Sequence, residues 1–246
     1  QNAKVLTTGA SNSQQDVTAG EFGIAIGSSS EVTGYHGVAV GLLSQASGIA
    51  ATAYGPEARA QALQAIAVGD ISTASGERSI AIGALTTANS AFATALGYAS
   101  SAVAQTSVAI GAASTASGDL STALGGAAEA SETGALAVGS QAIATGAGSA
   151  AIGYQSNSSG VRSVALGTQA VASGVSSIAA GDVAIATGTG STAIGPGSAA
   201  LADYSTAIGF GAISNEKGLM VLGGPNTTAI KLLGSTTTDT LKVSSL

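Results

Sequence analysis

A repeat of fourteen residues constrains this chain more than any other feature of its sequence. The phrase apolar-Ala-apolar-Gly, with threonine at some of the apolar places, runs from Ile24-Ala25-Ile26-Gly27 to Thr206-Ala207-Ile208-Gly209. The alanine two residues before the glycine never changes in these fourteen copies. We call the glycines of this phrase the signature glycines; they are Gly27, Gly41, Gly55, Gly69, Gly83, Gly97, Gly111, Gly125, Gly139, Gly153, Gly167, Gly181, Gly195 and Gly209. A register kept without insertion predicts a stacked repeat rather than a globular enzyme.

The residues around each invariant alanine predict a short β-strand. Twelve of the fourteen residues three places before the signature glycines are β-branched, which favours a strand over a helix. Val108 and Ile110 illustrate the bulky side of this strand, whereas Ser107 and Ala109 illustrate its small side. Both sides are therefore expected to be buried, with the bulky side inside the roll and the alanine side against sister chains.

The second half of each repeat predicts another strand with one wet face. A stretch such as Ser72-Thr73-Ala74-Ser75-Gly76 alternates small and polar residues. A second glycine often follows the signature glycine by seven residues, and we expect glycines to supply the conformations of both turns. Stacked repeats then form a parallel β-roll in which each strand pairs with its copy fourteen residues on. At ~4.8 Å per rung the rod would be roughly 65–70 Å long.

The other repeat architectures with a similar period fit poorly. Apolar residues two places apart and 36 glycines are incompatible with the helical seam of a coiled coil. Collagen would require glycine at every third residue. A calcium-binding roll would require a repeated Gly-Gly-x-Gly-x-Asp pattern, whereas Asp70, Asp119 and Asp182 are scattered. The sequence therefore predicts an all-β solenoid.

Composition excludes several classes of function. The 246 residues carry a formal net charge of −6, and only 8% of them are charged. This disfavours electrostatic binding to nucleic acid or to an anionic membrane, which requires clustered Lys and Arg. The absence of cysteine removes thiol nucleophiles, Cys-ligated zinc and iron–sulfur sites. A roll this thin cannot cover its own apolar strand face, so we expect self-association, with a trimer as the smallest closed ring.

Several copies of the phrase resemble the head repeat of trimeric autotransporter adhesins, the YadA-like head. They include Ser79-Ile80-Ala81-Ile82-Gly83, Ser107-Val108-Ala109-Ile110-Gly111 and Ser163-Val164-Ala165-Leu166-Gly167. The likeness spans about Ala19 to Gly209, and Met220-Val221-Leu222-Gly223 is expected to be a degraded fifteenth copy.

The tail from Thr238 to Leu246 resembles the neck motif of this family, with Thr240, Leu241 and Lys242 where Ala, Val and Asn are usual. The resemblance implies a left-handed roll, a homotrimer, a stalk and a C-terminal outer-membrane barrel, so this chain would be a head and neck without its anchor. We therefore expect a lead-in segment over residues 1–18, the repeats over 19–223 and a neck-like segment over 224–246.

The residues that could perform catalysis are isolated. His36 is the single histidine and falls in a predicted turn. Glu129 and Glu132 fall in a solvated half-turn, and the charges at Glu77-Arg78 and at Glu57 and Arg59 are expected to be surface charges. We predict no catalytic residue, no cofactor and no metal site.

Two further patterns have simpler interpretations. Gly146-Ala147-Gly148 and Gly188-Thr189-Gly190 lack the strand, helix and lysine of a phosphate-binding loop, so they are expected to be turns. A threonine column that includes Thr94 and Thr122 is interrupted by Ile and Val, which disfavours ice binding.

The residues eight and nine places after the signature glycines vary most. They include Tyr35-His36, Glu77-Arg78, Ala91-Phe92, Asp119-Leu120, Val161-Arg162 and Asp203-Tyr204. A fixed core with a changing rim is typical of repeat proteins that bind partners. The preferred hypothesis is a bacterial cell-surface adhesin head for extracellular matrix proteins, host cells or other bacteria, with no nucleic acid partner and no membrane contact by these residues. The alternative is a structural spacer or a phage-fibre-like rod without a ligand.

Overall fold

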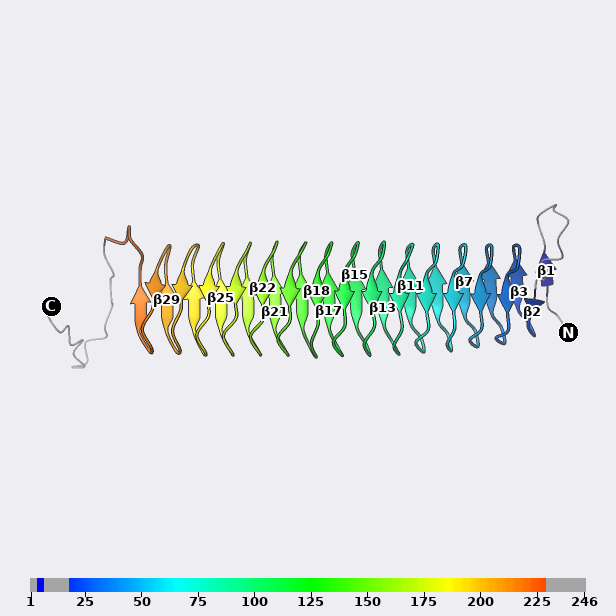
Figure 1. The fold of residues 1–246 in the computed structure, drawn as a ribbon, viewed down its shortest axis with the longest axis horizontal. Helices are drawn as coiled ribbons and strands as arrows, with labels where there is room; N and C mark the ends of the chain where they lie inside the picture. Colours follow the sequence, from blue (N-terminus) through cyan, green and yellow to red (C-terminus); the bar gives the residue numbers. More distant parts are fainter. Residues whose placement is uncertain (1–3, 7–17, 229–246) are drawn as a thin grey trace, which may run out of the picture.

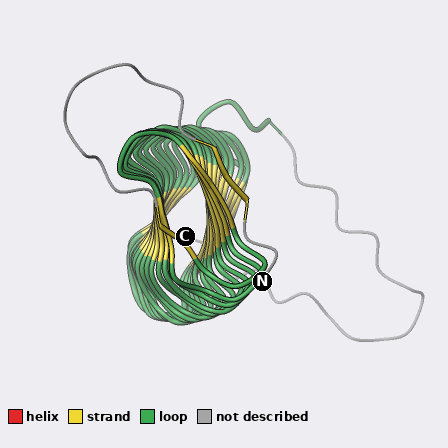
Figure 2. Ribbon diagram, turned by 90° about the vertical axis from the view of Figure 1, so that its right-hand side faces the viewer, coloured by secondary structure: helices red, strands yellow, loops and turns green. Residues whose placement is uncertain are grey.

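The chain forms a long, straight β-solenoid. The computed structural model describes residues 4–6 and 18–228, and it holds no helix within them (Figure 1). Each fourteen-residue turn contributes one strand of three residues and one of two residues. Viewed along the axis, the turns superpose as a flattened ring, with strands on two opposite sides and loops at both ends (Figure 2).

The strands form two parallel sheets, which we call the long-strand sheet and the short-strand sheet. The long-strand sheet contains β1 (Lys4–Leu6), β3 (Ile24–Ile26), β5 (Val38–Val40), β7 (Thr52–Tyr54), β9 (Ile66–Val68), β11 (Ile80–Ile82), β13 (Thr94–Leu96), β15 (Val108–Ile110), β17 (Thr122–Leu124), β19 (Leu136–Val138), β21 (Ala150–Ile152), β23 (Val164–Leu166), β25 (Ile178–Ala180), β27 (Thr192–Ile194), β29 (Thr206–Ile208) and β31 (Met220–Leu222). The short-strand sheet contains β2 (Thr18–Ala19), β4 (Glu31–Val32), β6 (Gln45–Ala46), β8 (Arg59–Ala60), β10 (Thr73–Ala74), β12 (Thr87–Ala88), β14 (Ser101–Ala102), β16 (Thr115–Ala116), β18 (Glu129–Ala130), β20 (Ile143–Ala144), β22 (Asn157–Ser158), β24 (Val171–Ala172), β26 (Ile185–Ala186), β28 (Ala199–Ala200) and β30 (Ile213–Ser214).

The register of pairing confirms the predicted roll. From β3 and β4 onward each residue pairs with the one fourteen places on, as Ala109 does with Ala123. The pairing of Ala207 with Val221 confirms the fifteenth copy. At the N-terminal end Ala19 pairs with Val32, only thirteen residues away, so the even register begins after β2.

The interior is lined by alanine, which reverses the predicted orientation of the long strands. All the invariant alanines, such as Ala109, have 0% exposed surface, and the small residues four places before the signature glycines, such as Ser107, are buried beside them. The bulky neighbours Val108 and Ile110 point outward and remain half-exposed. The expectation that the bulky side would fill the roll and the alanine side would meet sister chains is therefore wrong.

The cause of this reversal is the small separation of the two sheets. Val32 is the largest fully buried side chain of the described residues. Gly23 and Gly37, which directly precede β3 and β5, lie beside it, and a Cβ atom on either would come within 2.8 or 2.7 Å of the Val32 Cγ1 atom. Valine in place of alanine on the short-strand side of the interior thus requires the loss of a methyl group on the long-strand side. Only side chains no larger than valine fit between the sheets at native packing density.

Interior serines satisfy their hydroxyl groups locally. Ser44 Oγ donates to the Gly41 carbonyl oxygen at 3.0 Å, and Ser163 Oγ donates to the Gly160 carbonyl oxygen at 2.7 Å. This bond to the carbonyl three residues earlier recurs along the rod, so serine and alanine can exchange in the interior. Other interior serines, such as Ser177 and Ser205, have no hydrogen-bond partner among the described residues.

The turns depend on the signature glycines and on two further positions. The signature glycines have φ between +123° and +145°, and a Cβ atom on Gly97 would lie 2.8 Å from the Gly111 carbonyl oxygen. The residues two and nine places after each signature glycine also have positive φ, and most of them are not glycine. Even Ile71 and Val183 have φ near +55° there. The expectation that glycine supplies all turn conformations is therefore wrong.

The described residues include no helix that is long and apolar enough to cross a bilayer.

The orientation of the long strands predicts unequal effects of enlarging two side chains in the middle of the rod. Ala109→Leu places three extra carbon atoms between the sheets, whereas Thr115→Leu changes an outward side chain. We expect Ala109→Leu to lower the unfolding free energy by about 2 kcal/mol or more through overpacking, and Thr115→Leu to change it by less than about 0.5 kcal/mol. Differential scanning calorimetry measures both effects, and equal transition temperatures would contradict the assigned orientation.

The turn geometry predicts that glycine is favourable at one alanine and unfavourable at a neighbour. Ala113 is exposed with φ of +56°, whereas Ala116 is buried in the interior. Ala113→Gly should raise the unfolding free energy by about 0.5 kcal/mol, because it relieves the cost of the left-handed conformation. Ala116→Gly should lower it by about 1.5 kcal/mol, because it removes a buried methyl group and adds backbone entropy to the unfolded state. Thermal unfolding of the two variants checks this, and destabilisation by Ala113→Gly would count against the turn conformation.

Candidate binding surfaces

The solenoid presents four surfaces, each built from fixed positions of the repeat. The apolar strip is the outer side of the long-strand sheet, three and one residues before each signature glycine, from Ile24 to Ile208. The short-strand face is the outer side of β4 to β30. The first rim comprises the residues one and two places after each signature glycine, and the second rim comprises those eight and nine places after.

The apolar strip runs the length of the rod, with threonine at five of its positions. None of its positions holds a charged residue. Its side chains remain partly exposed, with Leu166 at 48% and Ile194 at 42%. At ~4.8 Å per rung the strip is roughly 65–70 Å long. A continuous apolar surface of this extent marks an interaction site rather than ordinary protein surface.

The short-strand face changes character along the rod. From β4 to β18 the outward residues are polar or charged, which confirms the predicted wet face. They are Glu31, Gln45, Arg59, Thr73, Thr87, Ser101, Thr115 and Glu129. Beyond this point most of them are apolar; the residues are Ile143, Asn157, Val171, Ile185, Ala199 and Ile213. The expectation of a uniformly wet face is therefore wrong for the C-terminal third.

The second rim contains the residues that the sequence identified as variable. His36 stacks on Phe22 of the preceding rung with ring centroids 5.2 Å apart, and Tyr35 meets the His36 ring edge-on at 4.3 Å. Further along, Arg78 lies over the Phe92 ring at 5.7 Å. Its Nε donates to Gln64 Oε1 at 2.9 Å. Side chains of this rim thus contact their copies on neighbouring rungs and form a ladder that follows the rod.

The first rim is a second candidate binding surface, which the sequence pattern of the second glycines does not predict. It exposes large apolar side chains, among them Leu42, Leu43, Tyr98, Tyr154 and Phe210, the last at 66%. The same signal that identified the second rim was present here, because the two residues after each signature glycine also vary from repeat to repeat.

Three glutamines of the first rim form an amide ladder. Gln155 Nε2 donates to Gln141 Oε1 at 2.9 Å, and Gln169 Nε2 donates to Gln155 Oε1 at 3.0 Å. The three residues occupy the same position on successive rungs, fourteen residues apart. The spacing of the sheet therefore sets the spacing of the amides.

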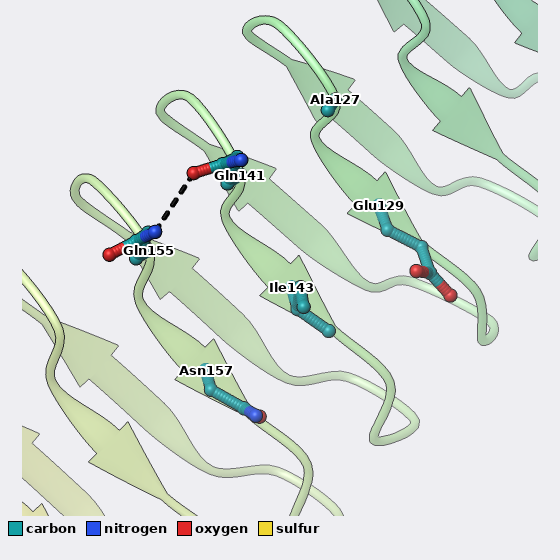
Figure 3. Close-up of a pocket in the computed structure, with 6 residues that line it drawn as sticks. All are labelled: Ala127, Glu129, Gln141, Ile143, Gln155 and Asn157. Carbon is teal, nitrogen blue, oxygen red and sulfur yellow. Dashed lines mark hydrogen bonds between the residues drawn. The ribbon is translucent and has the colours of Figure 1, made fainter.

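A shallow groove of about 470 Å³ lies beside this ladder, between the first rim and the short-strand face. Gln141 and Gln155 are exposed along one edge, and Ile143 and Asn157 form its half-buried floor (Figure 3). Ala127 and Glu129 line the same groove on the preceding rung. Glu129 is the one charged residue of this lining, and its Oε1 accepts a hydrogen bond from Ser131 Oγ at 2.7 Å.

The remaining sequence candidates lie apart from one another. Glu129 lies on the short-strand face and Glu132 in the following turn, both exposed. Within residues 4–6 and 18–228, no group of three His, Cys, Asp or Glu residues is arranged to hold a metal ion. Gly148 and Gly190 have φ of +63° and +64° in the turns before β21 and β27, which confirms that the two Gly-x-Gly stretches are turns. The threonine column points outward within the apolar strip.

Most of the neck-like segment, including its motif from Thr238 to Leu246, lies outside the described residues, as does most of the expected lead-in segment.

The repeats of this chain match a family of known proteins. The family model described as "YadA head domain repeat (2 copies)" matches residues 19–44, 33–58, 46–70, 60–86, 74–100, 88–114, 102–128, 116–142, 130–156, 144–170, 158–184 and 186–212. The crystal structure of the collagen-binding domain of the Yersinia adhesin YadA has a TM-score of 0.42 and 27% sequence identity, covering 69% of this chain and 80% of that chain. No curated protein matches the chain. The matched repeats account for most of the sequence, and the chain belongs to the YadA head-repeat family of surface adhesins.

Proposed function

We propose that the chain is the binding head of a homotrimeric adhesin on the surface of a Gram-negative bacterium, and that it attaches the cell to extracellular matrix proteins, host cells or other bacteria. The observation that supports this most directly is the combination of a uniform backbone with two rims whose side chains change at every rung. A rigid repeat support with variable display residues suits recognition over a long surface. Membership of an adhesin family supports the same function.

The apolar strip supports the proposed trimer. A single roll leaves this uncharged surface in water, whereas three copies arranged around an axis would cover it. Interface centres are depleted of charge and enriched in apolar side chains, as the strip is. We therefore keep the hypothesis of a homotrimer, but its chains would meet through the apolar strip rather than through the alanine side of the long strands.

Multivalency provides the proposed mechanism of attachment. In a trimer each rim position appears three times around the rod, and neighbouring rungs present further side chains at ~4.8 Å intervals. Weak contacts repeated in this way give strong attachment, because every contact after the first forms within one complex. We further propose that the repeats end near Gly223 and that residues 224–246 lead to a stalk in the longer protein.

The proposed function is non-enzymatic. The family is one of adhesins, which are not enzymes. Among the described residues His36 contacts Phe22 and Tyr35, and its setting is an aromatic cluster on an exposed rim rather than a pocket.

A charge placed in the apolar strip should prevent trimer formation. Ile110→Asp together with Leu124→Asp introduces two carboxylates on adjacent rungs of the strip, where association would desolvate them. We expect the trimer to dissociate at least about a hundredfold more readily, since each buried unpaired charge costs about 3 kcal/mol or more. Sedimentation equilibrium measures the change. The matched control is Ser101→Asp with Thr115→Asp, two carboxylates on adjacent rungs of the short-strand face, and it should remain trimeric. A stable monomer of the unmodified protein would contradict the proposal.

If the proposal is right, the protein binds ligands itself and does not merely hold another domain away from the cell. The trimeric protein is tested for binding to immobilised collagen, fibronectin and laminin and to epithelial cells, with albumin as the control surface. We expect saturable binding to at least one of these ligands, and weaker binding by a monomeric strip variant because avidity is lost. A structural spacer would bind none of them, and that result would overturn the proposed function.

A further inference from the structure

The groove beside the glutamine ladder differs from the rest of the rod in its chemistry. Four of its six lining residues end in an amide or a carboxylate, namely Glu129, Gln141, Gln155 and Asn157. The other two, Ala127 and Ile143, are apolar. A few convergent polar groups around an apolar floor are typical of a small-molecule binding site.

The amides of the ladder retain unused hydrogen-bonding capacity at the edge of the groove. A primary amide has two N–H donors and two acceptor lone pairs. Within the ladder Gln155 donates once, to Gln141, and accepts once, from Gln169. One donor and one lone pair of Gln155 therefore remain for a ligand, and the neighbouring bonds hold the amide in place. Such preorganisation reduces the entropy that binding must otherwise overcome.

The floor of the groove contributes a further polar group. The Oδ1 atom of Asn157 is buried and has no hydrogen-bond partner among the described residues. An unsatisfied amide oxygen is unfavourable in the free protein. Rotation of this side chain toward the groove would pair it with a hydroxyl group of a ligand.

The backbone around the groove is not available to a ligand. The N–H groups of Gln141 and Ile143 donate to the carbonyl oxygens of Gly126 and Ser156, each at 2.8 Å. The N–H group of Asn157 donates likewise to the Ala170 carbonyl oxygen at 2.8 Å. A peptide therefore has no open strand edge to extend here. Recognition must come from side chains, which favours a ligand with many hydrogen-bonding groups of its own.

We propose that this groove binds a short, uncharged oligosaccharide. Planar amide and carboxylate groups pair with the neighbouring hydroxyls on the edge of a pyranose ring, and Ile143 and Ala127 offer an apolar surface for its C–H face. The ~4.8 Å rung spacing is close to the length of one sugar residue, so successive rungs meet successive sugars. Glu129 and the net charge of −6 disfavour sulfated or sialylated glycans.

This inference rests on the proposed function and deepens it, because it assigns a ligand class to one site on the adhesin surface. The probes are cellotriose and triacetylchitotriose, as neutral ligands, and a heparin tetrasaccharide, as the anionic one. Binding to the whole protein is measured by saturation-transfer difference NMR and by titration calorimetry. We expect at least one neutral probe to bind and heparin to give no signal.

Groove variants locate the binding site. Gln141→Ala with Gln155→Ala should weaken binding of the neutral probe about tenfold or more, since two hydrogen-bonding groups are lost. Ile143→Glu should weaken it as well, by replacing the apolar floor with a second carboxylate. Gln45→Ala is the matched control, because Gln45 lies outward on β6 of the same sheet, outside the groove, and it should leave binding unchanged. All these side chains point outward, and circular dichroism confirms that each variant folds.

Three results would overturn the inference: no binding of either neutral probe at millimolar concentration, equal loss in Gln45→Ala and in the double variant, or capture of a matrix peptide that depends on the groove without any sugar binding. Retained attachment to matrix proteins or cells in the first case would leave the proposed function intact. Sugar binding without attachment to any tested surface would instead overturn the proposed function alone.

Discussion

The small distance between the two sheets determines the rest of this molecule. Because only side chains no larger than valine fit between them, alanine and serine fill most of the interior, and the one valine buried among the described residues, Val32, has glycines beside it on two rungs. Such a thin interior buries little apolar surface for each residue. The hydrogen-bonded ladder compensates for this: backbone pairing continues through the turns, as in the bond from Leu43 N–H to the Ser28 carbonyl oxygen at 2.9 Å. The fold is therefore stabilised by regular stacking more than by a large core.

The same constraint places the bulky side chains outside and thereby connects fold to assembly. Ile, Val and Leu residues that would fill the core of a wider protein are held in a strip on the outer side of the long-strand sheet. Their burial requires other chains, so the stability of the head and its oligomeric state are expected to be coupled. The surfaces left free are then the two rims and the short-strand face, whose side chains do not enter the interior and can change from rung to rung. Sequence variation is thus concentrated at positions whose side chains do not fill the space between the sheets.

The sequence predicted the backbone almost completely. The fourteen-residue spacing gives the strand positions, the parallel pairing and even the degraded copy at Met220–Leu222, because a repeat with constant length has only one in-register stacking. It predicted the wrong side of the long strands, such as β15, to face inward. Period-two alternation shows that the two sides of a strand differ, but both sides here are apolar or small, and the choice depends on the distance between sheets.

Two further features also required the structure. The left-handed conformation of residues such as Ile71 has no sequence signature, since it is imposed by stacking on neighbouring turns rather than by local preference. The groove could not be predicted from the sequence either, because Gln141 and Ile143 become neighbours of Gln155 and Asn157 only when the turns stack.

The central claim is that the invariant alanines face the interior and that the small distance between the two sheets keeps solvent and reagents away from them. Thiol labelling tests it directly, since the chain contains no cysteine. Ala137→Cys places a thiol in the interior, and Ala112→Cys places one on the exposed first rim. The account predicts that a maleimide reagent labels Ala112→Cys at once and Ala137→Cys only after unfolding. Rapid labelling of the folded Ala137→Cys protein would contradict it.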